Sequence, residues 1–358
     1  ISIEVGKRFE LWDQDWKIPL QYGIRQVYGE NGGPGGLFHS LRQIPPIIEI
    51  CEDINLICPD AVVFNFSNPM QRICHAVTTK FPDLKFIGLC HEIKSMNRQL
   101  PDLMETEMHN IEFRAAGLNH LSILLEARYK NTGKDGYPII KQNFDAYFSD
   151  LVNKHDAKPS KPGAERGVFR KLFKTYGYLP ITTDSHLGEY IQWAYSVADH
   201  DAILDFYDNY KEKCLAFYDN KTSYDHFFDL NNLDTHERVV PIIEGILSDS
   251  AYEEPAINIP NNGYIECLPK DIVVEVPGII NKSGISGISF KNYPAAFGSL
   301  LNSQSGVIQM TTDAVLNASK HSAYLALLAD PVVNDSYQAE KLLNNMLETQ
   351  GKFLYYLK

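Results

Sequence analysis

The stretch "AVVFNFSNPMQRICHAVTTKFPDLKFIGLCHE" (residues 61–92) decides the fold. Two short runs within it, 61–66 and 85–90, are apolar and rich in β-branched and aromatic residues, as buried strands are. Between them, apolar residues from 70 to 77 recur at helical spacing, and Pro69 is suited to open a helix. Strand, helix and strand in about thirty residues predict a βαβ unit with parallel strands.

Polar residues follow both predicted strands at their carboxyl ends. "SNP" (67–69) follows the first strand and "CHE" (90–92) follows the second. Because parallel sheets bind ligands at the carboxyl ends of their strands, we expect Asn68 and Cys90 to line one cleft. A lone buried cysteine usually serves as a small hydrophobic core residue. At this place in the fold, Cys90 could have that role, or it could be a nucleophile or a metal ligand.

The same kind of pattern predicts further elements outside this unit. They are a helix over 47–58 with Pro46 at its first position, a loop over 153–167, an exposed helix over 203–218, a strand over 271–280 and a helix over 312–328.

Composition excludes several classes of partner. The 358 residues carry 33 Lys+Arg against 45 Asp+Glu, a net charge of −12, which argues against nucleic acid and anionic membranes. No apolar run approaches the ~20 residues of a membrane span, and the first residues lack the features of a signal peptide. The six cysteines are scattered without a CxxC pair, so we expect them reduced and the protein cytoplasmic.

Three other segments hold groups capable of chemistry. "GLNHL" (117–121) contains Asn119 and His120, and an imidazole paired with the Cys90 thiolate suits a divalent transition metal, although most histidines are only hydrogen-bonded. "ENGGPGG" (30–36) places Glu30 before glycines that let a ligand approach the backbone closely, or that simply form a turn before a helix.

The third segment, "DSHLGEY" (184–190), contains His186 and Tyr190. Such a density of titratable groups indicates either a site or the polar face of a helix. A substrate with a carboxylate would need a cation, and Arg166, Arg170 and His186 are the candidates.

The order "GPGG", "SNPM", "GLCHE", "GLNH", "SHLGEY" and "VVEVPG" resembles glycoside hydrolase family 4, the NAD- and metal-dependent glycosidases, over essentially the whole chain. "NPM" and "HLGEY" look most like members that act on α-galactosides and α-galacturonides. The resemblance implies an α/β fold like that of lactate and malate dehydrogenases. A Rossmann-type parallel sheet (1–92, the C-terminal part of the NAD-binding domain) would join a larger α/β substrate domain (93–358).

Family members begin with a strand and a "GxGS" turn that holds the NAD pyrophosphate. This turn is not found in the sequence. We therefore expect the Rossmann domain to be incomplete at its N-terminus, and the NAD-binding residues stay unassigned.

The resemblance also implies a reaction. It is the hydrolysis of α-galacturonides or related α-hexosides by NAD-dependent oxidation at C3, elimination, addition of water and re-reduction, an exception to two-carboxylate glycosidases. The residues that match family positions are Cys90 and His120 as ligands of Mn²⁺ or another divalent metal, Asn68 and Asn119 at the sugar, Tyr190 as base and Glu30 as acid, with His186 added as a substrate-binding residue.

Expected partners are a small sugar or uronic-acid glycoside and further copies of the chain, as a homodimer or homotetramer. Two rival functions remain. A 2-hydroxyacid dehydrogenase of the lactate or malate type would share the fold and need no metal. A truncated, inactive family 4 homologue would keep the fold without holding NAD.

Overall fold

The protein is described by a computed structural model over residues 1–153, 166–219 and 238–358. Its β1 (Val62–Asn65), α3 (Met70–Lys80) and β2 (Lys85–Gly88) form the predicted βαβ unit. The two strands are parallel, with Val62 opposite Lys85 and Asn65 opposite Gly88, which confirms the prediction. Most of the loop predicted over 153–167 lies outside the described residues.

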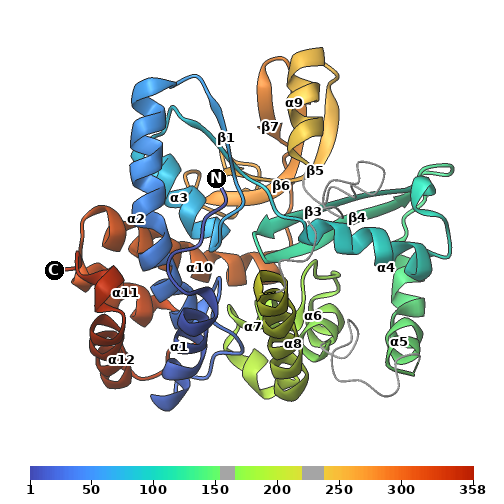
Figure 1. Cartoon of the computed structure of the whole chain (residues 1–358). Coiled ribbons are helices and arrows are strands. Elements are labelled where there is room, and N and C mark those ends of the chain that lie inside the picture. The colour runs from blue at the N-terminus through green and yellow to red at the C-terminus, as the bar shows by residue number, and fades with distance from the viewer. Residues whose placement is uncertain (154–165, 220–237) are drawn as a thin grey trace.

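The parallel pair belongs to a mixed sheet in which every other pairing is antiparallel. The strand order is β1-β2-β5-β6-β3-β4, and β7 pairs with β6. This sheet runs through the middle of the molecule, with α9 above it and α10 below it in Figure 1. The remaining strands are β3 (Ile111–Leu118), β4 (Leu121–Tyr129), β5 (Tyr252–Pro260), β6 (Val273–Asn281) and β7 (Gly284–Gly287).

The fold is therefore α/β and Rossmann-like, and the strand expected over 271–280 is confirmed as β6. Only one residue pair, Gly88 with Asn258, joins β2 to β5 in the ladder. The division of the chain at residue 92 stays a prediction.

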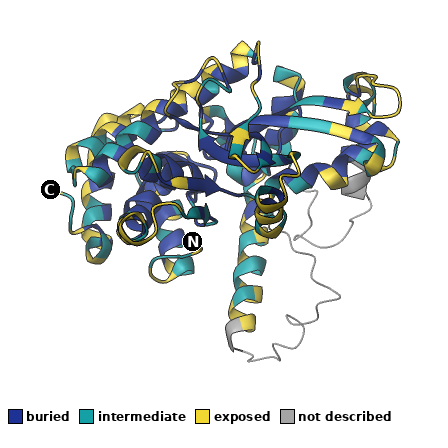
Figure 2. Cartoon of the chain, turned by 90° about the horizontal axis from the view of Figure 1, so that it is seen from above, coloured by how far each residue is buried: buried dark blue, intermediate teal, exposed yellow. Residues whose placement is uncertain are grey.

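Helices cover the sheet, and buried residues concentrate in the strands and on the helix faces next to them (Figure 2). The helix expected over 203–218 is confirmed as α8. No helix among the described residues has both the length and the apolar character to cross a bilayer. The helices other than α3 are α1 (Arg8–Gln21), α2 (Gly33–Ile57), α4 (Ser95–Met104), α5 (Tyr137–Asn153), α6 (Gly167–Tyr176), α7 (Asp184–Gly188), α8 (His200–Asp219), α9 (Val239–Ser248), α10 (Ala295–Leu316), α11 (Lys320–Ala329), α12 (Ser336–Thr349) and α13 (Gly351–Leu354), with short 3₁₀ turns η1 (Glu92–Lys94), η2 (Met108–Asn110) and η3 (Gln192–Ser196).

The predicted start of the helix at Pro46 is wrong. Helix α2 begins thirteen residues earlier, with Pro34 in its first turn, and it continues through Pro45 and Pro46. A proline inside a helix lacks the N–H that would donate to the carbonyl four residues earlier, which for Pro45 is the carbonyl of Leu41. The hydroxyl of Tyr356 donates to that carbonyl, Leu41 O, at 2.8 Å, so a distant residue replaces the missing bond.

The single helix predicted over 312–328 is also wrong. The chain leaves α10 after Leu316, and Ala318 adopts a left-handed backbone with φ of 51°. Ser319 then caps α11, its side chain accepting a hydrogen bond from Ser322 N. The apolar spacing on both sides of the break is helical, so periodicity alone did not reveal the turn.

Candidate active site

A cavity of about 370 Å³ opens at the carboxyl ends of β1 and β2. Five of the seven predicted site residues line it, and they come from five separate regions of the chain. Its size lies within the range of small-molecule sites. These five residues are Glu30, Asn68, Cys90, His120 and His186.

Cys90 and His120 contact each other at the wall of this cavity. Cys90 Sγ lies 3.4 Å from His120 Nε2, although thirty residues separate them in the chain. His120 sits in the two-residue turn between β3 and β4 with φ of 62°, a conformation uncommon for residues other than glycine. Strained backbone of this kind concentrates at functional sites.

The chemistry of this pair fits a metal. Burial, with the neighbouring His186 and His91, holds the pKa of His120 well below its usual value, so its ring is the neutral form that binds metals. Burial raises the pKa of the Cys90 thiol, as do the charges of Glu275 and Glu92, so metal binding would have to release the proton of this thiol. No three Cys, His, Asp or Glu residues converge as a metal site in the described ranges, so other positions would be left to water or substrate oxygens.

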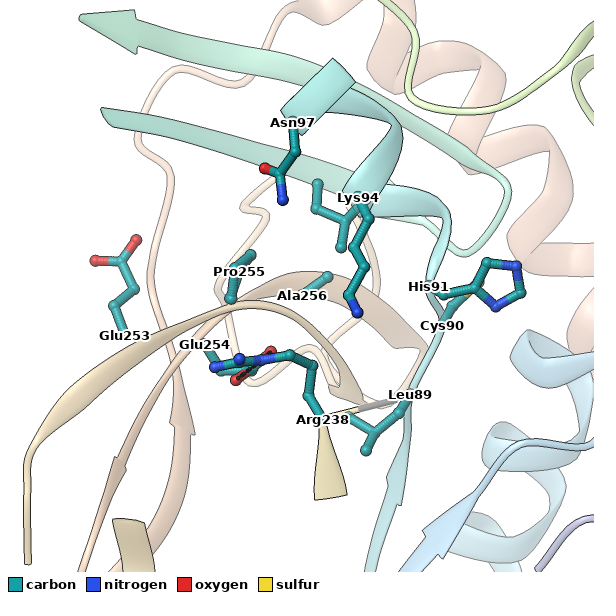
Figure 3. Close-up of a pocket in the computed structure, with 11 residues that line it drawn as sticks. Leu89, Cys90, His91, Lys94, Asn97, Arg238, Glu253, Glu254, Pro255 and Ala256 are labelled. Atoms are coloured by element: carbon teal, nitrogen blue, oxygen red, sulfur yellow. Dashed lines mark hydrogen bonds and ion pairs between the residues drawn. The ribbon is translucent and has the colours of Figure 1, made fainter. Parts of the chain in front are cut away.

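Cys90 also borders a second, smaller hollow of about 250 Å³. Figure 3 shows Lys94 directed toward the Arg238–Glu254 pair there, while the His91 ring is turned away from that pair. Arg238 Nε lies 3.0 Å from Glu254 Oε1. Leu89, Cys90 and His91, at the end of β2, line both hollows.

The loop that carries Glu30 is fixed by a buried carboxylate. Glu189 accepts hydrogen bonds from the backbone N–H groups of residues 30, 31 and 32, at 2.8, 3.0 and 2.9 Å. The glycines that follow allow close packing, since a Cβ on Gly35 would lie 2.4 Å from Gly29 Cα. Of the two alternatives for the glycine-rich segment, the structure shows a tight turn into a helix.

The side chain of Glu30 meets polar neighbours at the cavity wall. Asn68 Nδ2 donates to Glu30 Oε1 at 3.2 Å, and Arg8 lies 4.0 Å from the same oxygen. Asn68 and Cys90 therefore share one cleft, as the parallel strands predicted.

His186 lies between two carboxylates and above His120. Its Nδ1 is 3.9 Å from Glu30 and 3.8 Å from Glu189, and its ring centroid is 4.3 Å from that of His120. Burial alone would lower the pKa of His186, but Glu189 and Glu30 raise it to about 9. The cavity therefore contains a cationic imidazole beside a neutral one.

Asn119 and Tyr190 lie behind the cavity wall rather than on it. Asn119 is 1% exposed and donates its side-chain amide to Glu275 at 2.7 Å. Tyr190 is 7% exposed, and its hydroxyl contacts Asn119 O at 3.5 Å. Burial and Glu189 raise the pKa of Tyr190 well above its usual value, while the buried Arg72 opposes this shift.

The two arginines considered for a substrate carboxylate lie elsewhere. Arg166 donates to Thr182 O at 3.2 Å, and Arg170 lies 3.6 Å from Asp145. Neither lines the cavity. Arg8, which sequence reasoning missed, is the arginine that reaches it, stacked 4.1 Å above the Trp12 ring.

Sequence reasoning also missed the aromatic wall. Its side chains come from α1 and α8, two helices that are far apart in sequence. The signal available was the aromatic density of "FELWDQDW" (9–16) and "DFYDNY" (205–210), which is equally typical of packed helices. The missed residues that line the cavity include Arg8, Trp12, Glu92, Tyr207 and Tyr210.

Comparison with known proteins decides the family. Residues 1–106 match the family model described as "Family 4 glycosyl hydrolase". Residues 115–333 match the model of the "Family 4 glycosyl hydrolase C-terminal domain". The chain belongs to glycosyl hydrolase family 4. It is thus a family 4 glycosidase and not a 2-hydroxyacid dehydrogenase.

Individual relatives agree with this family 4 assignment. The chain is 46% identical over 383 residues to an alpha-glucosidase of Erwinia rhapontici, covering 100% of this chain and 82% of that protein. It is 30% identical to an alpha-galacturonidase of Thermoanaerobacterium saccharolyticum, covering 99% and 79%. The fold matches a solved 6-phospho-alpha-glucosidase from gut microorganisms in complex with NAD and Mn²⁺, with a TM-score of 0.77, 20% identity, and coverage of 98% and 80%.

Proposed function

We propose that this family 4 enzyme hydrolyses α-glycosides of a neutral hexose, with an α-glucoside as the first candidate. The observation that carries the chemistry is the Cys90–His120 pair at the cavity, 3.4 Å apart and next to Glu30 and Asn68. A thiol and a neutral imidazole on a cleft wall suit a catalytic divalent metal with open positions. The sugar preference is supported by the alpha-glucosidase that is 46% identical.

We assign the metal position to Cys90 and His120 and propose Mn²⁺, the ion bound by the 6-phospho-alpha-glucosidase of similar fold. NAD would lie near the carboxyl ends of β1 and β2, as dinucleotides do in such sheets. When bound, the metal supplies a Lewis acid beside the sugar hydroxyls, and NAD supplies a reversible hydride acceptor for C3. No glycine-rich pyrophosphate turn occurs in residues 1–358, so no residue is assigned to NAD.

The residues of the chain then have separate tasks. Tyr190 takes the proton from C2, which is acidic once C3 is a ketone. A tyrosine needs positive charge nearby to act as a base. Burial and Glu189 raise the pKa of Tyr190 well above its usual value, buried Arg72 opposes this shift only in part, and a metal ion held nearby would lower the pKa further. Glu30 gives a proton to the leaving oxygen, and Asn68 and Arg8 orient its carboxyl group. Water then adds at C1, C2 regains a proton, and C3 would regain the hydride that NAD had accepted, so that the net reaction is hydrolysis.

An α-galacturonide is the second candidate substrate. The cationic His186, with a pKa raised to about 9, lines the cavity together with Arg8, and both could face a carboxylate. Against it, both cations already lie within about 4 Å of the Glu30 carboxylate. Arg166 and Arg170, two of the three cations expected to face this substrate, do not line the cavity, whereas the third, His186, does.

The proposal is tested by assaying p-nitrophenyl α-glucoside, α-galactoside and α-galacturonide with NAD⁺, Mn²⁺ and a reductant. We expect turnover of the glucoside, dependent on both cofactors and abolished by a chelator. Deuterium at C2 of the sugar should wash out into solvent. A fluorescence titration with NAD⁺ in parallel tests whether this chain holds the cofactor.

Cys90→Ser separates metal chemistry from ordinary hydrolysis, because serine keeps the shape but is a poor metal ligand. Full activity of this variant in the presence of a chelator, with no exchange at C2, would refute the redox-elimination mechanism. Absence of NAD⁺ binding would favour the inactive homologue. Faster turnover of the galacturonide than of the glucoside would make the α-galacturonide the preferred substrate candidate.

A further inference from the structure

One row of residues crosses five strands beneath the cavity. Pairing places Gly88 of β2 opposite Asn258 of β5, Asn258 opposite Glu275 of β6, Glu275 opposite Gly117 of β3, and Gly117 opposite Ser122 of β4. Directly opposed residues of antiparallel strands point to the same face. The three polar side chains therefore lie in one line, and the two glycines leave room for them.

Glu275 binds the members of this row together. Its Oε1 accepts from Ser122 Oγ at 2.9 Å, and its Oε2 accepts from Asn119 Nδ2 at 2.7 Å and Asn258 Nδ2 at 3.3 Å. Asn258 Nδ2 also lies 3.4 Å from Gly88 O. One carboxylate, 4% exposed, thus connects the β3–β4 turn with the end of β2.

These are the two segments that carry Cys90 and His120. Cys90 follows Gly88 by two residues, and His120 lies in the turn that Asn119 begins. The backbone connects them weakly, because β2–β5 and β3–β6 are each joined by a single residue pair. The left-handed backbone of His120, with φ of 62°, also has to be held by surrounding contacts.

We propose that Glu275 is a positioning residue that sets the separation of Cys90 Sγ and His120 Nε2. It touches neither the metal nor the sugar, and it acts through Asn119, Ser122 and Asn258. This inference rests on the metal site proposed above. Groups behind metal ligands typically affect metal affinity 10–100-fold, because they fix the direction from which the ligands approach.

Glu275→Gln is the direct test, since it keeps the shape but replaces one acceptor oxygen by a donor that faces donors. Mn²⁺ affinity is measured by calorimetry and by electron paramagnetic resonance without sugar, under reducing conditions. We expect Mn²⁺ to bind about 10–100-fold more weakly than to the unmodified protein. Thermal unfolding of the metal-free protein is recorded in parallel.

Glu254→Gln is a matched control, because Glu254 is a buried carboxylate (2% exposed) on the neighbouring strand β5. It accepts from Arg238 and Tyr252, and within the described part of the chain it forms no hydrogen bond to the β3–β4 turn. This variant should lower the melting temperature while Mn²⁺ affinity changes by less than about twofold. If Glu275 had only a structural role, Glu275→Gln would likewise lower the melting temperature and leave Mn²⁺ affinity nearly unchanged.

Cys90→Ser and His120→Ala distinguish a failure of the metal site from a failure of the positioning role of Glu275. If both retain the Mn²⁺ affinity of the unmodified protein, the metal site is wrong and the role of Glu275 falls with it. If both lose Mn²⁺ while Glu275→Gln binds it normally, the metal site stands and the positioning role is overturned. Should Glu275→Gln fail to fold, Ser122→Ala removes only one of the three bonds, and it should weaken Mn²⁺ binding at least about threefold, whereas unchanged affinity refutes the role.

Discussion

Two buried carboxylates hold two sets of segments around the cavity, and they do so in different ways. Glu189 accepts three backbone N–H groups from residues 30–32, whereas Glu275 accepts from the side chains of Asn119, Ser122 and Asn258. Backbone donors cannot turn away when their acceptor is lost, but amide and hydroxyl side chains can rotate to other partners. We infer that Glu189 is needed mainly for folding of the 30–32 loop. Glu275 is needed mainly to set the separation of Cys90 and His120.

Tyr190 connects the two sides, since it follows Glu189 in sequence and its hydroxyl contacts Asn119 O. Tyr190→Phe should lower kcat by about 10²–10⁴, the usual effect of losing a general base. Folding should remain nearly intact because the ring still packs against the Gly32 backbone. Steady-state rates and the melting temperature together check this. Turnover within threefold of the unmodified enzyme would remove Tyr190 from the base role.

Glu189→Gln tests how strongly the folding of loop 30–32 depends on the Glu189 carboxylate. One carboxylate oxygen accepts from both Asn31 N and Gly32 N, and the other accepts from Glu30 N. An amide leaves at least one buried N–H without an acceptor, so we expect unfolding free energy to fall by about 2–3 kcal/mol. Urea unfolding measures the loss. A loss below about 1 kcal/mol would show that the loop holds itself.

Gly35→Ala probes the packing of the same loop. The added Cβ would lie 2.4 Å from Gly29 Cα and 2.7 Å from Gly29 O, both backbone atoms that cannot move alone. Overpacking of this kind should cost about 2–3 kcal/mol of unfolding free energy. Gly306→Ala in α10 is the control, because nothing lies within 4 Å of its added Cβ. This control should be neutral or slightly stabilising in the same urea experiment.

Asp330, a buried carboxylate near Glu189, should make the free energy of unfolding depend on pH. Burial raises its pKa from 3.8 to about 6, the charge of Glu189 adds to this, and Arg72 opposes it. Because the folded-state pKa is raised, its stabilising contribution is full below about pH 4 and is lost as pH rises through about 6.

Asp330→Asn should remove this dependence, since the amide oxygen can still accept from Val332 N. Relative to the unmodified protein, the variant should gain about 2 kcal/mol of unfolding free energy between pH 4 and pH 7. Urea unfolding at both pH values checks the difference. Parallel curves for the two proteins would show that Asp330 is ionised at both pH values.

Much of the site was predictable because its signals are local. The parallel pair β1–β2 follows from two apolar runs and a helix of the right length, and this placed Asn68 and Cys90 together. The pairing of Cys90 with His120 was suggested by the chemistry of a thiolate and an imidazole, and the family resemblance then implied it. The arginine expected at the substrate was misplaced, because a charged side chain in sequence gives no indication of whether it faces solvent or a cavity.

The sequence by itself determined the βαβ unit, the family and the residue types at the cavity, because apolar periodicity and short motifs are written in neighbouring residues. Only the tertiary structure decided that α2 passes through two prolines, that Arg8 reaches the cavity, and that Glu275 joins the two segments behind the site. Each of these depends on a partner more than twenty residues away along the chain, such as Tyr356 for Leu41 or Asn119 for Glu275. Such contacts follow from how the sheet brings distant strands together, which no local pattern encodes.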